Sequence, residues 1–228
     1  MKLYPLGIFG PYPAAGAAAS GYLLEENGTR LVMDMGAGTL ARLLEICDIE
    51  EIDGIFISHL HYDHTSDLLP LRYLLEEKNK TMRLITQKSD TEWYKILTSH
   101  PLLEVVEASV ETELRLSGLT LRFFEMQHTA ACLAVRVEGE KTLVYSGDTV
   151  YCEELLRAVQ GADCLLADCA KPIGFTGPHM SADKAILLYE KTGVPIIATH
   201  LSPDFSPEEI FAPYDKIKTA KMNCCYDI

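Results

Sequence analysis

The sequence predicts an α/β fold in which two β-sheets pack face to face and helices cover their outer faces. Strand-like and helix-like stretches follow one another in two halves of similar pattern. Apolar residues make up 48% of the chain, which is enough for a sizeable core. No Pro/Gly/Ser-rich or charge-rich linker interrupts the sequence, so we expect one domain over residues 1–228.

The first half reads mainly as strands and turns. Asn27-Gly28 is a favoured tight-hairpin pair, and Gly10–Gly16 is a Pro/Gly/Ala turn region. Thr65 is the expected N-cap of a helix, and Ser89-Asp90-Thr91-Glu92 predicts a capping box that opens another helix. The remaining expected elements are strands at Lys2–Phe9, Ser20–Glu25, Thr29–Asp34, Ile52–Ile57 and Met82–Thr86, and helices at Thr39–Cys47 and Thr65–Glu77.

The second half begins with hairpins and then alternates helix and strand. Ser206-Pro207-Glu208-Glu209 combines a Ser cap, a Pro at the first helical position and a capping Glu, so it predicts a helix start. The other expected elements are two hairpins, Thr112–Ser117 with Leu119–Met126 and Cys132–Val137 with Thr142–Tyr145, then helix Glu153–Val159, strand Asp163–Ala167, helix Ala182–Lys191 and strand Pro195–Thr199.

Charge and composition limit the kinds of molecule that this chain is expected to bind. The formal net charge is −13, which disfavours binding to a long nucleic-acid tract or an anionic membrane but still permits a small anionic substrate at a metal site. We see no secretory signal at the start and no apolar run long enough for a bilayer. The seven cysteines form no C-x-x-C pair, as is typical of reduced thiols, so we expect a cytoplasmic location.

Ligand-type residues crowd into S-H-L-H-Y-D-H-T at residues 58–65, directly after a predicted buried strand. On an extended segment His59, His61 and Asp63 point the same way, and His64 reaches the same cavity if a helix starts there. Imidazole and carboxylate together suit a borderline divalent ion such as zinc. Three buried imidazoles so close together would each need a partner, so we predict a metal site.

Three more ligand types lie at predicted strand ends. His128 follows Leu119–Met126, Asp148 follows Thr142–Tyr145 in S-G-D-T, and His200 follows Pro195–Thr199. Ligands from distant parts of a chain gather at strand ends along one sheet edge. We therefore expect these three residues to join the cluster.

The S-H-L-H-Y-D-H stretch resembles the H-x-H-x-D-H signature of the metallo-β-lactamase superfamily of hydrolases. Met33-Asp34-Met35-Gly36 and S-G-D-T resemble two further motifs of that superfamily, in the expected order. The resemblance implies a four-layer αββα sandwich with a dinuclear site. By that pattern one ion is held by His59, His61 and His128, the other by Asp63, His64 and His200, Asp148 bridges them, and Asp34 supports the ligands.

Within the superfamily, the chain is most similar to the short-form, ribonuclease-Z-like branch. The likeness is carried by G-P-Y-P-A-A-G-A-A-A-S-G-Y-L-L near the start and by Gly177–Ala185, which resembles a phosphodiesterase stretch. It implies that His179 is catalytic and that Asp168 orients it. Ribonuclease Z proper carries a long insertion before the bridging aspartate, whereas here only a tight hairpin separates His128 from Asp148. This departure argues against precursor transfer RNA.

The expected function is hydrolysis of a nucleotide or small phosphodiester by a hydroxide shared between two divalent ions. Zinc is favoured, with Mn²⁺ and Fe²⁺ as alternatives. Asp63 would orient the nucleophile or take its proton, and His179 would stabilise the leaving oxygen. The same site also suits carbonyl esters, namely lactones, thioesters or β-lactams. A non-enzymatic scaffold is the other alternative. The resemblance further suggests a homodimer.

Overall fold

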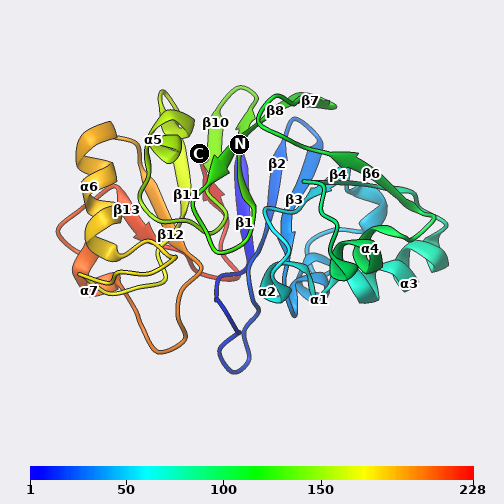
Figure 1. The fold of residues 1–228 in the computed structure, drawn as a ribbon, viewed down its shortest axis with the longest axis horizontal. Coiled ribbons are helices and arrows are strands. Elements are labelled where there is room, and N and C mark those ends of the chain that lie inside the picture. The colour runs from blue at the N-terminus through cyan, green and yellow to red at the C-terminus, as the bar shows by residue number, and fades with distance from the viewer.

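The computed structural model describes all of residues 1–228 and contains two seven-stranded sheets packed face to face. Figure 1 shows the strands in the middle of the molecule, with α1–α4 on one side and α5–α7 on the other. The predicted fold class, a four-layer αββα sandwich, is confirmed.

The first sheet has the strand order β14-β1-β2-β3-β4-β5-β6. β1, β2 and β3 are antiparallel, and β3 to β6 run parallel. Asn27 and Gly28 both have positive φ angles, 49° and 79°, as the predicted hairpin between β2 and β3 requires. The strands are β1 Lys2–Gly7, β2 Gly21–Glu26, β3 Thr29–Met35, β4 Gly54–Phe56, β5 Met82–Thr86, β6 Leu103–Glu107 and β14 Tyr226–Asp227.

The second sheet has the order β13-β12-β11-β10-β9-β8-β7 and repeats the same plan. β7 to β10 are antiparallel, and β10 to β13 are parallel. Both predicted hairpins of this half are confirmed. The strands are β7 Glu113–Leu116, β8 Leu119–Met126, β9 Cys132–Glu138, β10 Thr142–Tyr145, β11 Cys164–Asp168, β12 Ile196–Thr199 and β13 Ile217–Thr219.

Seven α-helices and one 3₁₀ helix accompany the sheets. None of them is long and apolar enough to cross a lipid bilayer. They are α1 Thr39–Leu43, the 3₁₀ helix Ile49–Glu51, α2 Tyr62–Thr65, α3 Leu68–Lys78, α4 Glu92–Thr98, α5 Glu153–Val159, α6 Ala182–Thr192 and α7 Glu208–Phe211.

Three buried apolar clusters correspond to the three interfaces between the four layers. The largest lies between the sheets and includes Phe56 and Phe123, whose ring centroids are 5.5 Å apart. A second packs α5, α6 and α7 on the second sheet, with Leu188 among its members. The third packs α1, α3 and α4 on the first sheet, with Leu71 among its members. Burial of these faces holds the layers together.

The structure corrects the expected start of the helix after residue 65. Thr65 ends the short helix α2 and donates its hydroxyl to His61 O at 2.8 Å, so it is not an N-cap. The helix is interrupted after α2 because Asp67 forms hydrogen bonds with residues that are distant in sequence. Its backbone N–H donates to Met35 O, and its carboxylate accepts from Leu40 N. These contacts hold the break between α2 and α3 against the start of α1.

Two other predicted caps also differ. Thr91, not Ser89, caps α4 by accepting from Tyr94 N at 3.2 Å. Helix α7 begins at Glu208 with no side-chain cap, and Ser206 Oγ lies 3.5 Å from Glu208 N. The sequence interpretation also missed β6, β13 and β14 at the sheet edges.

We predict that Phe123→Ala lowers the free energy of unfolding by about 3–5 kcal/mol, because it removes a buried ring from between the sheets. Urea denaturation measures this change. Glu125→Ala, at an exposed position of the same strand, is the matched control and should leave the midpoint unchanged. Equal midpoints for the two variants would contradict the role given to the inter-sheet cluster.

Candidate metal centre

The metal centre lies at one edge of the sandwich, where strands of both sheets end. His59 and His61 follow β4, and Asp63 and His64 lie on α2. His128 follows β8, Asp148 follows β10 and His200 follows β12; the structure thus gathers all seven residues expected to bind metal.

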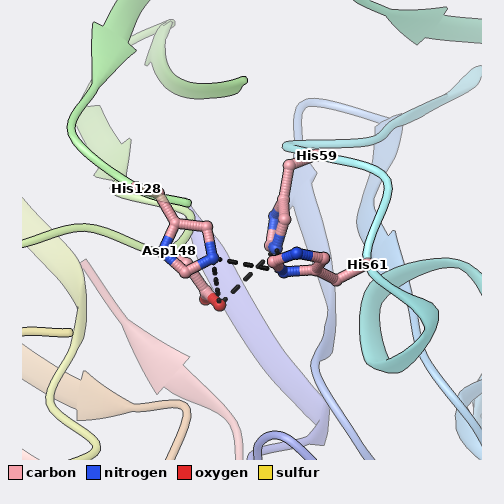
Figure 2. A group of neighbouring side chains, drawn as sticks. All are labelled: His59, His61, His128 and Asp148. Atoms are coloured by element: carbon pink, nitrogen blue, oxygen red, sulfur yellow. Dashed lines mark hydrogen bonds and ion pairs between the residues drawn. The ribbon is translucent and has the colours of Figure 1, made fainter. Parts of the chain in front are cut away.

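Four of these residues form the first group, His59, His61, His128 and Asp148, whose ligand atoms lie within 4.8 Å of one another. Figure 2 shows their side chains converging from separate segments. His61 Nδ1 lies 2.9 Å from His59 Nε2 and 3.2 Å from His128 Nε2. Nitrogens bound tetrahedrally to one zinc ion at its usual bond length are separated by about 3.3 Å. The spacing therefore suits one ion.

Hydrogen bonds fix which ring nitrogens carry lone pairs. His59 Nδ1 donates to Ser58 Oγ at 3.0 Å, and His128 Nδ1 donates to Pro178 O at 3.0 Å. The Nε2 lone pairs of both rings therefore converge on His61 Nδ1. A proton on His61 Nδ1 could pair with only one of the two facing lone pairs, and the other would still be repelled. A cation between the three nitrogens would attract all three lone pairs and so remove this repulsion.

Asp63, His64 and His200 form the second group. His64 Nε2 lies 3.5 Å from Asp63 Oδ2, and His200 Nε2 lies 3.2 Å from the same oxygen. Asp148 reaches both groups, because its carboxylate oxygens lie 3.5 Å from His59 Nε2 and 3.3 Å from both His64 Nε2 and His200 Nε2. This position suits a ligand shared by two ions.

Asp34 is the hydrogen-bonding centre beneath these ligands. Its Oδ2 accepts from Ser58 Oγ at 2.7 Å, Tyr145 OH at 2.6 Å and His64 Nδ1 at 2.6 Å, and its Oδ1 accepts from Ser58 N. The bond from His64 Nδ1 leaves the Nε2 lone pair aimed at the second group. Asp34 is fully buried and has a φ of 61°, an uncommon backbone conformation for a residue other than glycine.

The N-terminal loop packs tightly against the second group. A Cβ added at Gly10 would lie 1.9 Å from His200 Nε2. The loop is held there because Gly10 N donates to Leu201 O and Leu201 N donates to Ile8 O. The sequence analysis expects only a turn in this Pro/Gly/Ala stretch. The structure shows that residue 10 must be glycine, because any side chain there would clash with His200.

Three buried polar atoms of the centre have no hydrogen-bond partner, namely His64 Nε2, Asp148 Oδ1 and His200 Nδ1. Two of them, on His64 and Asp148, face each other at 3.3 Å between the two groups. Leaving such atoms unpaired in a protein interior is costly, and an ion between the groups would satisfy His64 Nε2 and Asp148 Oδ1. His200 Nδ1 lies on the other side of its ring, 3.8 Å from Asp168 Oδ1. The residues present therefore fit a pair of divalent cations.

The electrostatics of the centre favour ionised carboxylates beside imidazoles. Burial lowers the pKa of His59 well below its usual value, which keeps the ring neutral. Burial alone would raise the pKa of Asp148, but His200, His64 and His59 hold it well below its ordinary value. Burial alone would lower the pKa of His64 and of His200, but Asp148 raises both, so these two rings would release protons when metal binds. Neutral imidazole and ionised carboxylate are the forms that bind metal.

His179 lies in the loop before α6 and belongs to a third set of potential ligands within 4.8 Å of one another, namely Asp148, Asp168, His179 and His200. Its Nδ1 donates to Asp168 Oδ2 at 2.9 Å. Asp168 is fully buried at the end of β11 and also accepts from Thr149 N and Ala170 N. The sequence analysis expects His179 and Asp168, besides Asp63, to act in catalysis. These two residues are hydrogen-bonded to each other, and His179 Nε2 is left free.

A pocket of about 330 Å³ opens onto the centre. Pro11 of the N-terminal loop and Pro178 lie on its walls, together with ligand-type residues from both groups; the latter are His61, Asp63, His128 and Asp148, with His179 beside them. A small substrate that enters this pocket contacts His179 and both groups at once.

Sequence reasoning misjudged how Asp63 reaches the centre. The residue lies in α2, which starts after His61, and not on an extended segment with His59 and His61. Sequence reasoning also missed Ser58 and Tyr145, which hold Asp34. Ser58 directly precedes His59 and could have been noticed, whereas Tyr145 lies 111 residues from Asp34 and carries no local signal.

A protein-family model matches the part of the chain that contains the metal centre. Residues 29–200 match the beta-lactamase superfamily domain, which is most of the chain and includes both groups. The probable metallo-hydrolase YhfI of Bacillus subtilis is 28% identical over 88% of this chain and 87% of its own. Its crystal structure superposes with a TM-score of 0.91 over 99% of each chain, at 25% identity.

Two further similarities are more distant. Ribonuclease Z of Methanopyrus kandleri is 26% identical over 60% of this chain and half of its own length. The crystal structure of the short form of human tRNase Z superposes with a TM-score of 0.81, covering 100% of this chain and 99% of that one. Its 18% identity shows a shared fold alone.

We predict that Asp148→Ala loses at least one of two bound ions, because it removes the carboxylate that reaches both groups. Elemental analysis of the purified protein measures the metal content. The control is His100→Ala, since His100 pairs with Glu76 at 2.9 Å and belongs to neither group. Metal content equal to wild type in Asp148→Ala would rule out a bridging carboxylate.

Asp34→Ala is expected to weaken metal binding by about 10- to 100-fold, since residues that orient ligands have effects of this size. The variant leaves His64 without the acceptor that fixes its ring. Competition with a chromophoric chelator measures the affinity. Tyr145→Phe, which removes one donor to Asp34 and keeps the carboxylate, should have a smaller effect. The reverse order of the two variants would contradict this role for Asp34.

Proposed function

The chain belongs to the β-lactamase superfamily and is a metallo-hydrolase, and from that premise we propose that it cleaves phosphodiesters of nucleotide size or smaller. The observation that carries the proposal is the hydrogen bond of 2.9 Å from His179 Nδ1 to Asp168, beside the two metal-binding groups. The other features below support the same reaction.

The metal ions would be held by the two groups described above, with Asp148 between them. Imidazole nitrogen with carboxylate oxygen is a donor set that suits zinc, so we propose zinc as the ion. Two divalent ions in such a site supply a hydroxide nucleophile near neutral pH and draw charge from the phosphoryl oxygens.

Asp63 is placed to handle the proton of the nucleophile. Its side chain is 9% exposed and lines the pocket, and its Oδ2 lies 3.2 Å from His200 Nε2 of the same group. With Oδ2 directed at the ion site of the second group, the other carboxylate oxygen can face the reacting water. Asp63 therefore orients the water and receives its proton.

His179 is proposed to act on the leaving oxygen. The bond to Asp168 fixes the ring, so Nε2 lies in the pocket that also contains Asp63 and Asp148. Protonated at both nitrogens, the imidazole donates from Nε2 to the departing oxygen as the bond to phosphorus breaks.

The substrate is proposed to be small. Only β9 and β10, joined by a tight turn, separate His128 from Asp148, so no long arm extends from this part of the chain. The net charge of −13 opposes binding of a long polyanion. Similarity to a protein named ribonuclease Z supports phosphodiester chemistry and does not extend to its substrate.

A direct test compares three chromogenic compounds: bis(4-nitrophenyl) phosphate, 4-nitrophenyl acetate and nitrocefin. The metal-loaded protein should have its highest kcat/KM on the phosphate. Removal of metal by a chelator should abolish this activity, and re-addition of zinc should restore it. A higher kcat/KM on the acetate or on nitrocefin would favour the carbonyl-ester alternative instead.

We predict that His179→Ala lowers kcat on a phosphodiester by about 10²- to 10⁴-fold, the usual contribution of a general acid. The metal content should stay at the wild-type value, because His128 and His200 keep their own contacts. His100→Ala serves as the control for both measurements. Wild-type turnover by His179→Ala would show that this residue is not the acid.

A further inference from the structure

A second pocket adjoins the metal centre, with a volume of about 490 Å³. It shares His61 and Tyr62 with the pocket that opens onto the centre, so the two pockets adjoin at these side chains. Apart from His61, no residue that lines it belongs to the metal-binding groups, and the proposed roles of Asp63 and His179 do not use it. We propose that this second pocket binds the base of a nucleotide substrate, stacked on Tyr62 and Trp93; the inference rests on the proposed function.

Two aromatic side chains form a corner in this pocket. The rings of Tyr62 and Trp93 meet edge to face, with centroids 5.0 Å apart and an interplanar angle of 83°. Tyr62 is 69% exposed, which is unusual for a large ring beside a buried centre. A flat ligand can stack on one ring and place its edge against the other, as bases do on aromatic side chains.

Hydrogen bonds hold the tryptophan in place and connect it to the metal centre. Trp93 Nε1 donates to Thr65 Oγ1 at 3.1 Å, and Thr65 Oγ1 donates to His61 O at 2.8 Å. The indole is therefore fixed before any ligand arrives, which lowers the entropic cost of binding. The chain of bonds ends at the backbone of a residue in the first metal-binding group.

Polar groups on the pocket wall suit the edge of a base. Gln87, Ser89 and Thr91 contribute amide and hydroxyl groups next to the aromatic corner. Gln87 Nε2 donates to Ser58 O at 3.3 Å, so its carbonyl oxygen is available as an acceptor. Half of the ten lining residues are hydrophobic. Apolar walls with a few polar groups are typical of small-molecule sites.

No acidic side chain lines the pocket to repel a nucleotide. The chain has 33 acidic residues, yet no Asp or Glu is among the residues that line this pocket. Lys88 lines it, and its ammonium lies 3.2 Å from the carboxylate of Glu107, which is not a lining residue. A nucleotide whose phosphate lies at the metal centre can therefore place its base here without meeting a carboxylate.

Trp93 is the sole tryptophan of the chain, so its fluorescence reports directly on this pocket. We expect adenosine 5′-monophosphate to quench the emission of the metal-loaded protein saturably. Ribose 5-phosphate, which has the same phosphate and sugar but no base, should not quench it. Equal quenching by both compounds, or none by the nucleotide, would overturn the proposal.

Matched variants at Tyr62 test the stacking itself. Tyr62→Leu removes the ring and should weaken nucleotide binding by about 10-fold, near the lower end for a stacked base. Tyr62→Phe keeps the ring and should bind like wild type, since stacking uses the face of the ring and the side chain is largely exposed. Metal content is measured for both variants, because Tyr62 lies between two ligand-type residues. Equal affinities of the two variants, with equal metal content, would refute stacking on Tyr62.

Kinetics separate this inference from the proposed function. Thymidine 5′-(4-nitrophenyl phosphate) and methyl 4-nitrophenyl phosphate share a leaving group and differ in the base. Wild type should prefer the thymidine ester, and Tyr62→Leu should lose about 10-fold of that preference through KM. If neither ester is cleaved, phosphodiesterase activity is refuted. The base site is then tested by the fluorescence titration, which does not depend on turnover. If both are cleaved without preference, only the base site is refuted.

Discussion

The metal centre depends on the relative position of the two sheets, because each half of the chain supplies only part of the ligands. His59, His61, Asp63 and His64 come from the first half, and His128, Asp148 and His200 from the second. A small slide of one sheet over the other would separate the two sets. The four-layer sandwich must therefore hold its central interface in one register.

Apolar packing alone gives a weak preference among such registers, since burial depends on area more than on direction. Two buried hydrogen bonds that cross between the sheets add direction. Tyr145 of β10 donates to Asp34 of β3 at 2.6 Å, and the Tyr22 hydroxyl of β2 lies 2.7 Å from Thr199 Oγ1 of β12. The two tyrosine rings also contact each other, with centroids 5.1 Å apart. Buried polar groups must be paired, so sliding the sheets apart is costly at these points.

The sequence was sufficient for the fold class, and it pointed to the seven ligand-type residues that the structure brings together, for reasons that particular residues show. Hairpin signals such as Asn27-Gly28 are local, and the density of ligand types at residues 59–64 is far above chance for a loop. The edge strands β6 and β13 were missed because short strands at a sheet edge carry little alternation. The break between α2 and α3 was missed because it depends on Asp67 contacting Met35 and Leu40, which are distant in sequence.

The interactions that sequence reasoning missed all link segments brought together only by folding. In the sequence, Tyr145 looks like any other large apolar residue of a buried strand. Its hydroxyl matters only because folding places Asp34 within hydrogen-bonding distance. Tyr62 and Trp93 are 31 positions apart, on α2 and α4, and the pocket between them exists because α2 ends one turn after His61. That short helix brings Asp63 and His64 to the metal centre and turns Tyr62 outward beside it. The same turn of helix therefore builds the metal centre and the adjoining aromatic wall, so a change in its length would alter both at once.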